Sequence, residues 1–530
     1  MRTGLVSYVT IGAMAERTYR KDYRPPDFRI DGVELDFFIC AEVTRVAARL
    51  RVAREDAAAA DAPLRLQGRH MTLQRIAIDG QNLATQEYEV DDAGLTVAAP
   101  PARFVLETEV EIDPDANTEL QGLYRSGSIL CTQCEAHGFS CITYFPDRPD
   151  VMTKYRTRIE ADAERYPVLL SNGDCVASGA LDGGRHYAVY EDPFPKPCYL
   201  FALVAGDLAC VVDRHRTGSG RDVALRFYTE PGSEGELGHA VASLKQAMAW
   251  DEQVYGLEYD LDSYMVVAVS SFNMGAMENK GLNIFNTACV LASPETATDK
   301  DYATVRDVIG HEYFHNYTGN RVTCRDWFQL SLKESLTVFR EQQFAADHGS
   351  PGVTRIGQLR LLHEAQFPED AGPNAHPVRP ESYLEINNFY TITIYQKGAE
   401  LIRMLHRILG HDGFVAGVRA YLRRFDGQAV TIEDFVAALE TENDTDLGQF
   451  RRWYETAGTP VVTAQDRFED GCYRITLSQR TPPTPGQPDK PLLHIPVAMG
   501  LLGSGDCAEQ MLHLTEAEQS WAFEGFQSRP

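Results

Sequence analysis

The first two hundred residues alternate between apolar and polar positions in short runs that turn signals interrupt. Examples are GVELDFF at 32–38, RFVLETEVEI at 103–112 and HYAVYED at 186–192. A period of two residues is typical of strands that bury one face. The pattern therefore predicts a β-rich N-terminal domain over residues 1–207, in which 1–17 form an extension before the first strand.

A helical period begins near residue 240 and continues to about residue 458. Apolar residues recur there every three or four positions, which is the spacing of one helix face. The predicted helices cover 240–255, 302–317, 330–347, 398–409 and 434–442, and a strand is predicted at 264–269. These elements define a second predicted domain, residues 208–458.

Alternation returns after residue 459. YRITLSQ at 473–479 predicts a strand, the proline-rich stretch 481–491 predicts a turn, and another strand is expected from Leu492. The third predicted domain is a β-sandwich over residues 459–530. Its roughly 70 residues are fewer than the ~100 of a complete sandwich, so we expect it to be incomplete. The fold class is multidomain α+β.

The chain is acidic. Its 76 acidic residues outnumber the 50 basic ones, which gives a formal net charge of −26 over 530 residues. This charge argues against nucleic acid or an anionic membrane as the main partner, because both require a basic face. No apolar run approaches the ~18 residues that span a bilayer. We therefore expect no membrane insertion, and the charge is compatible with substrates that carry a positive group.

The 11 cysteines are scattered and odd in number, which does not suggest a disulfide framework. Buried thiols in a reducing compartment, the cytoplasm, are the simpler interpretation. Cys131 and Cys134 have the spacing of a zinc or redox pair, but no second such pair completes a four-cysteine site. The first residues resemble a secretion signal only faintly, and Met14 is an alternative start to Met1.

Residues 311–315 read HEYFH, an HExxH motif. On a helix, His311 and His315 lie on one face, so both imidazoles can reach one metal ion. Glu312 lies about 100° further round and can address a water molecule beside that ion. The alternative is a helix with two histidines that bind no metal.

A catalytic zinc ion usually has three protein ligands and one open position. Glu334 follows His315 after 18 intervening residues and lies at the start of the predicted helix 330–347. A break at Gly319 and Asn320 lets the chain fold back, which would place Glu334 opposite the histidines. Taken alone, Glu334 would be a solvated helical residue; the HExxH spacing makes it the candidate third ligand.

These residues resemble the zinc signature of the gluzincin metallopeptidases. GAMEN at 275–279 resembles the exopeptidase signature of the aminopeptidase N family. Stretches 192–207, 273–286, 310–334 and 450–460 are similar to the bacterial, alanyl aminopeptidase branch of that family. The resemblance covers about residues 18–530.

The resemblance implies a saddle-like N-terminal β domain, a thermolysin-like catalytic domain and a partial β-sandwich. Family members also carry a helical C-terminal domain over the active site, and we expect this chain to be C-terminally truncated before it. The implied activity is a zinc-dependent aminopeptidase that releases N-terminal residues from peptides with a free amino terminus. One zinc ion per chain and a monomer are expected.

The resemblance also implies roles for individual residues. Zinc polarises the scissile carbonyl and lowers the pKa of a bound water, Glu312 accepts the proton, and Tyr395 donates to the oxyanion. Other residues are implied in substrate binding. They are Glu278, Gln133 and Glu135 on the substrate amine, Gly275 and Ala276 along the peptide backbone, Met277 and Asn279 within GAMEN, Met274 on the side-chain pocket and Tyr390 on the site wall.

Two details concern the residues implied at the substrate amine and the positions that differ from the family pattern. In an extended strand, Gln133 and Glu135 point the same way, so both can face one site, and Cys131 and Cys134 become bystanders. Ser335 stands where the family usually has Gly, and Gln396 where it has Glu.

Other functions remain open at this point. An endopeptidase, or a bifunctional epoxide hydrolase and aminopeptidase of the leukotriene hydrolase type, would use the same metal ligands. An inactive or poorly folded truncated peptide-binding fragment is the alternative from another class.

Overall fold

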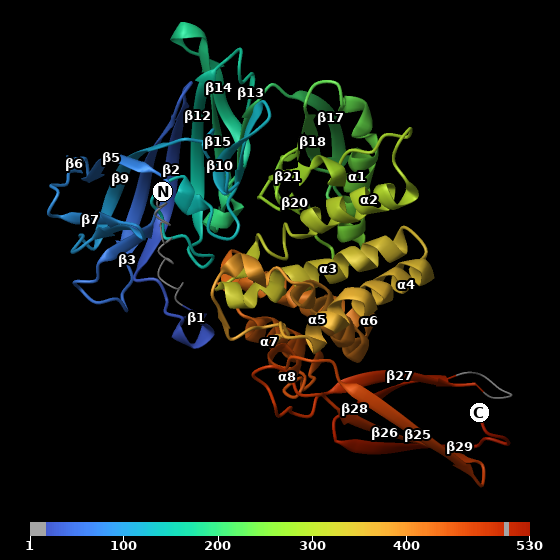
Figure 1. The fold of residues 1–530 in the computed structure, drawn as a ribbon. Coiled ribbons are helices and arrows are strands. Elements are labelled where there is room, and N and C mark those ends of the chain that lie inside the picture. Colours follow the sequence, from blue (N-terminus) through green and yellow to red (C-terminus); the bar gives the residue numbers. More distant parts are fainter. Residues whose placement is uncertain (1–16, 503–507) are drawn as a thin grey trace, which may run out of the picture.

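The computed structural model describes residues 17–502 and 508–530 of the chain. Strands, then mixed helices and strands, then strands again follow one another along the sequence (Figure 1). This order confirms the predicted multidomain α+β class. The faint secretion signal and the alternative start at Met14 lie outside the described residues.

The N-terminal region is built from β-sheets. Its eight-stranded sheet has the order β14 (Asp174–Ala180), β15 (Arg185–Lys196), β12 (Thr153–Asp162), β2 (Phe28–Ile39), β3 (Thr44–Arg54), β9 (Arg103–Ile112), β5 (Thr72–Ile78), β6 (Gln81–Asn82). Strand β3 alternates buried and exposed residues, as the sequence period predicts. A smaller sheet has the order β4 (Leu64–Gln67), β8 (Gly94–Val97), β7 (Tyr88–Asp91).

A four-stranded sheet of this region faces the site. Its order is β10 (Gly122–Ser126), β11 (Ile129–Gln133), β16 (Leu203–Gly206), β13 (Val168–Ser171). Every residue of β11 and β16 is buried. Strands that are apolar throughout pack on both faces. This burial gives the end of β11 a fixed position beside the central region.

The central region combines one sheet with eight α-helices in the described part of the chain. The sheet has the order β17 (Ala209–Arg216), β18 (Asp222–Thr229), β19 (Ser263–Val269), β21 (Leu282–Asn286), β20 (Ala276–Met277). The helices are α1 (Gly238–Val254), α2 (Asp299–Phe314), α3 (Leu330–Asp347), α4 (Pro351–Leu361), α5 (Phe367–Ala371), α6 (Gly398–Phe425), α7 (Ile432–Asn443) and α8 (Arg452–Glu455). Two short pairs, β1 (Thr18–Tyr19) with β23 (Ser382–Tyr383) and β22 (Val322–Cys324) with β24 (Gln428–Val430), complete it.

Helices α2 and α3 pack closely, and this contact positions the site. Thr298 and Asp301 form a capping box that starts α2. Gly310 allows the close approach, because a Cβ there would lie 2.9 Å from Cδ1 of Phe344 on α3. The fully buried Arg340 of α3 contacts Asp251 and donates to the carbonyl of Phe314 at 2.9 Å.

One predicted helix lies within a longer observed element, and one observed helix was not predicted. The predicted helix 398–409 is the first half of α6, which continues to Phe425 beyond Gly410, where φ is 70°. Gly410 has φ 70° and ψ 167°, which is not a helical conformation, so α6 is kinked there and the predicted helix end at Leu409 falls at the kink. Helix α4 was not predicted, and none of its residues is buried.

The C-terminal region contains two small antiparallel sheets. One has the order β25 (Val461–Glu469), β26 (Cys472–Arg480), β29 (Glu518–Glu524), and the other pairs β27 (Ile495–Leu501) with β28 (Ala508–Leu514). The predicted strand at 473–479 is confirmed as β26. The strand expected from Leu492 begins at Ile495.

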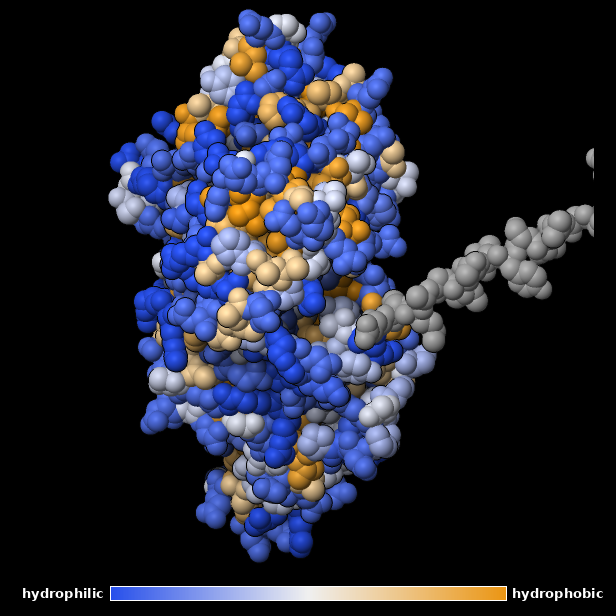
Figure 2. Space-filling view, turned by 90° about the vertical axis from the view of Figure 1, so that its left-hand side faces the viewer, coloured by the Kyte–Doolittle hydropathy of each residue, from blue (hydrophilic) through white to orange (hydrophobic). Residues whose placement is uncertain are grey.

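The surface of the molecule is largely polar on one face. On the face drawn in Figure 2, hydrophilic residues predominate and hydrophobic ones form small separate groups. Among the described residues, no helix combines the length and apolar character needed to cross a membrane.

Candidate metal and substrate site

Helices α2 and α3 bring three predicted ligands together. Nε2 of His311 and Nε2 of His315 lie 2.9 Å apart, and each lies 3.5 Å from Oε2 of Glu334. Tetrahedral zinc with ligands at about 2.0–2.2 Å places neighbouring ligand atoms about 3.3 Å apart. Two imidazoles and a carboxylate are also donors that zinc accepts. This donor set therefore fits a catalytic zinc ion.

Further contacts orient the two imidazoles. Nδ1 of His311 lies 2.9 Å from Oε2 of Glu341, and Nδ1 of His315 lies 3.0 Å from the carbonyl oxygen of Thr318. Both partners accept hydrogen bonds, so each Nδ1 carries the proton and each Nε2 presents its lone pair. The arrangement prepares both rings for metal binding.

Glu312 is buried next to the ligands without being one of the triad. Its Oε2 has no hydrogen-bond partner among the described residues. A carboxylate oxygen of Glu312 lies within 4.8 Å of ligand atoms of Glu278 and His315. Burial raises the pKa of Glu312 well above its ordinary value. A carboxylate with a raised pKa and a free oxygen is suited to accept a proton.

Two predicted acids meet beside the triad, at the junction of the β-rich and catalytic regions. Glu135 lies in the turn after β11, and Glu278 follows β20. Nζ of Lys333 contacts Oε1 of Glu135 at 2.7 Å and Oε1 of Glu278 at 2.6 Å. Burial raises the pKa of Glu135 to about 8, against the opposing effect of Lys333. For Glu278, burial would raise the pKa, but the nearby Lys333 and His315 together outweigh it and the pKa is lowered.

The expected strand geometry of Gln133 and Glu135 is wrong. Strand β11 ends at Gln133, so Glu135 is not the next residue on the same strand face. Both residues are nevertheless buried next to the GAMEN segment. Nε2 of Gln133 donates to the carbonyl of Glu135 at 3.3 Å and contacts Sδ of Met277 at 3.7 Å. A turn, rather than strand alternation, brings the two side chains to this place.

Both predicted tyrosines lie at the site. The hydroxyl of Tyr390 donates to Oε1 of Glu135 at 2.9 Å. Tyr395 lies in a π-helical turn, Thr393–Lys397, and burial together with the charge of Glu334 raises its pKa well above the ordinary value. Tyr395 therefore keeps its proton and can donate a hydrogen bond.

Ser335 connects this π-helical turn to α3. Its buried hydroxyl donates to the carbonyl of Ile394 at 2.7 Å, directly before Tyr395. Gly398 leaves room for this contact, because a Cβ there would lie 1.9 Å from Oγ of Ser335. Gln396 accepts a hydrogen bond from Gln342 at 3.1 Å. Two residues that depart from the family pattern thus both join the tyrosine segment to α3.

The GAMEN segment lies at a sheet edge. Strand β20 is the last strand of its sheet and pairs on one side with β21, where Ala276 faces Phe285. Asn286 donates to the carbonyl of Gly275 at 2.9 Å. An edge strand has free backbone groups that can pair with another extended chain.

The remaining predicted residues are placed as follows. Met274 is half-buried against the core of the β-rich region, and Asn279 is fully buried with no partner for either amide atom among the described residues. Cys131 and Cys134 are buried thiols whose pKa is raised by burial, and neither belongs to a potential metal group of the described chain.

Lys333 is the residue that the sequence reasoning missed. Besides Glu135 and Glu278, it contacts Oε1 of Glu334 at 2.6 Å, and only 1% of its side chain is exposed. The available signal was its place in an apolar turn of the predicted helix, next to Leu332 and Leu336. A lysine in such a turn requires a buried partner.

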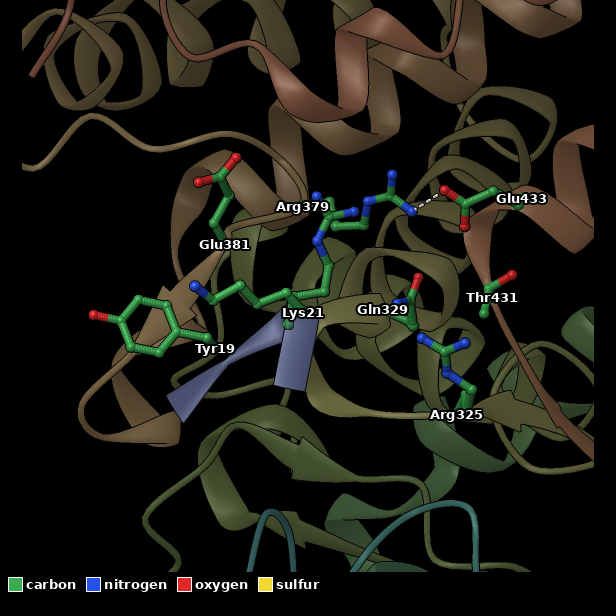
Figure 3. Close-up of a pocket in the computed structure, with 9 residues that line it drawn as sticks. Tyr19, Lys21, Arg325, Gln329, Arg379, Glu381, Thr431 and Glu433 are labelled. Atoms are coloured by element: carbon green, nitrogen blue, oxygen red, sulfur yellow. Dashed lines mark hydrogen bonds and ion pairs between the residues drawn. The ribbon is translucent and has the colours of Figure 1, made fainter. Parts of the chain in front are cut away.

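A separate cavity of about 680 Å³ lies away from this site (Figure 3). Its lining comes from β1 and the residues after it, the loop before α3, the segment near β23 and the start of α7. Two of the charged groups that line it, Arg379 and Glu433, form an ion pair. None of the residues that converge on the triad lines it, so it adds nothing to the metal site.

Comparisons with known proteins agree with this geometry. "Peptidase M1 N-terminal domain" matches residues 35–200, "Peptidase family M1 domain" matches 239–454, and "Domain of unknown function (DUF3458) Ig-like fold" matches 458–530. The chain is 51% identical to Aminopeptidase N of Escherichia coli (strain K12) over 524 residues, which are 97% of this chain and 60% of that protein.

Two further proteins, one compared by sequence and one by structure, are also similar to this chain. Aminopeptidase N of Caulobacter vibrioides is 56% identical over 455 residues, 86% of this chain and 52% of that protein. The crystal structure of Legionella pneumophila aminopeptidase A in complex with aspartic acid superposes with a TM-score of 0.88 at 34% identity, covering 97% of this chain and 59% of that chain. The chain thus spans about 60% or less of the length of these relatives.

Proposed function

This chain belongs to peptidase family M1, and from that premise we propose that it is a zinc-dependent aminopeptidase. The proposed reaction is hydrolysis of the first peptide bond of a peptide with a free amino terminus. The observation that carries the proposal is the convergence of His311, His315 and Glu334 on one point, next to two buried acids that can bind an ammonium group.

His311, His315 and Glu334 would hold the zinc ion. When bound, zinc supplies a Lewis acid for the scissile carbonyl and lowers the pKa of a water molecule. We assign Glu312 as the base that takes the proton from water and passes it to the leaving amine. Tyr395 donates a hydrogen bond to the developing oxyanion.

The substrate would enter along the GAMEN edge. Gly275 and Ala276 offer backbone groups to the peptide, and Met274 contributes to the side-chain pocket. Glu278, Glu135 and Gln133 bind the α-ammonium group, because a cation removed from water requires charged or polar partners. Met277, Asn279 and Tyr390 support these residues as the surrounding wall.

The proposal includes three further statements. The domains are 1–207, 208–458 and 459–530, with the zinc site in the second. The enzyme binds one zinc ion per chain and acts as a monomer. It works in the cytoplasm, which is supported by ten free cysteines in the described part of the chain.

The test compares alanyl amide substrates with free and with acetylated amino termini. We expect cleavage of the free substrate only, with a loss of at least about 100-fold on acetylation, because charge-assisted hydrogen bonds of roughly 1.5–3 kcal/mol each disappear. A zinc chelator should abolish turnover and added zinc should restore it.

The outcome separates the remaining alternatives. Equal cleavage of the acetylated substrate would indicate an endopeptidase. Zinc binding without cleavage of either substrate would indicate a peptide-binding protein and would contradict the proposed activity.

A further inference from the structure

Lys333 lies at the centre of three buried carboxylates. Its Nζ is 2.6 Å from Oε1 of Glu278, 2.6 Å from Oε1 of Glu334 and 2.7 Å from Oε1 of Glu135. The exposed fractions are 1% for the lysine side chain and 3–4% for the three acids. An ammonium group in this position balances charges that water cannot reach.

The same three acids could hold a metal ion without the lysine. Their carboxylate oxygens lie within 4.8 Å of one another, which is the geometry of a potential metal group. Three ionised carboxylates without a cation are strongly unfavourable in a buried site, so such a cluster either takes up protons or binds a divalent ion. Nζ of Lys333 therefore stands where a second metal ion would be bound.

The contacts leave one oxygen of Glu135 and one oxygen of Glu278 for another cation. Lys333 uses Oε1 of Glu135 and of Glu278, and Tyr390 also donates to Oε1 of Glu135. No hydrogen bond from the residues that the structure describes reaches Oε2 of either acid. Glu334 directs its own Oε2 to the histidines. Glu135, Glu278 and Lys333 together thus carry a net charge of about −1 when ionised, which matches one ammonium group.

We propose that the ammonium group of Lys333 occupies the position of a second metal ion. With Lys333 in place, Glu135 and Glu278 have the charge to bind one substrate ammonium group. Lys333 acts through the two acids and is a positioning residue. The match to an ammonium rests on the proposed function, whereas the exclusion of a second metal ion does not.

Other buried lysines of the described chain provide a control. Lys397 contacts Asp370 at 2.7 Å, and Lys196 contacts Asp192 at 3.1 Å. Each of them pairs with one carboxylate, whereas Lys333 contacts three. Loss of Lys397 therefore removes a buried ion pair without exposing a group of acids.

The experiment counts zinc ions per chain after equilibration with excess zinc and gel filtration. We expect one ion for the wild type, for Lys397→Met and for Lys333→Arg, whose guanidinium is also a cation. Lys333→Met should bind two. Combining Lys333→Met with Glu135→Gln should return the count to one, because one negative charge is removed with the positive one. A single ion in Lys333→Met would overturn the proposal.

Turnover gives a second readout. With alanyl substrates and one zinc equivalent, Lys333→Met should lower kcat about 10- to 100-fold without raising KM, because the acids still attract the ammonium but in a displaced position. A raised KM with unchanged kcat would contradict a positioning role.

Poor folding of Lys333→Met would still be informative. Binding to the folded state stabilises it, so excess zinc should then restore soluble yield and thermal stability. The double variant should fold without added zinc. Absence of both effects would overturn the proposal.

The two measurements distinguish failure of the proposed activity from failure of the proposed role of Lys333. If the wild type cleaves neither free nor acetylated substrates, the proposed activity fails. The zinc count of Lys333→Met still tests whether the lysine occupies a metal position.

Discussion

The metal triad and the acid pair lie side by side but are built differently. His311, His315 and Glu334 come from two consecutive helices that pack directly on each other. Glu135 and Glu278 come from two regions of the chain and meet only where the β-rich region contacts the catalytic one. The triad therefore depends on local helix packing, and the acid pair depends on the junction of two regions. Side-chain substitutions outside α3 should therefore affect one group and leave the other largely intact.

The largest expected effect that tests whether the metal triad and the acid pair act separately is that of Glu312→Gln. The amide keeps the shape of the side chain but cannot accept the proton, so kcat should fall about 1,000-fold, within the range of general-base losses. Zinc content and KM should stay close to the wild type, as measured by metal analysis and steady-state kinetics. Loss of zinc would show that Glu312 belongs to the local triad rather than acting beside it.

A smaller effect is expected in the acid pair, from Glu278→Gln. Removing one charge of the acid pair should lower kcat/KM by about 10- to 100-fold, which corresponds to roughly 1.5–3 kcal/mol for a charge-assisted hydrogen bond. Zinc binding should be unchanged, because the triad does not need the acid pair. Unchanged kinetics would remove Glu278 from amine recognition, and loss of zinc would show that the two parts are coupled.

The smallest effect is expected from Ser335→Ala, which alters the link between α3 and the Tyr395 segment. Losing the hydrogen bond to Ile394, worth about 1 kcal/mol, should lower kcat about 2- to 10-fold with little change in KM. Thr337→Ser, on the same helix, is a control that keeps its hydroxyl. A change in KM larger than that in kcat would place Ser335 in substrate binding instead.

The local part of the site could be predicted from the sequence. His311 and His315 follow one helical period, and the break at Gly319 and Asn320 before the predicted helix 330–347 indicates how Glu334 can fold back toward them. Glu135, Glu278 and Tyr395 required the family resemblance, since each acid or tyrosine by itself is more often a surface or core residue. The strand argument for Gln133 and Glu135 failed, because β11 ends at Gln133, two residues before Glu135.

Other features could not be predicted because they depend on distant contacts. Lys333 is an ordinary helix former by sequence, and only the arrival of Glu135 and Glu278 from elsewhere shows why it is buried. The contact of Ser335 with Ile394 likewise requires the π-helical turn to lie against α3. The sequence places a helix end at Leu409, where Gly410 breaks the helical backbone, but it did not indicate the second half of α6 beyond this kink.

Helix α3 touches every part of the site. Glu334 joins the triad, Lys333 joins the acid pair, Ser335 supports the tyrosine turn, and Glu341 orients a histidine. A shift or tilt of this one helix would displace all four residues together. A displacement of α3 would therefore disturb the metal triad, the acid pair and the tyrosine turn at the same time. The parts of the site are assembled together or lost together.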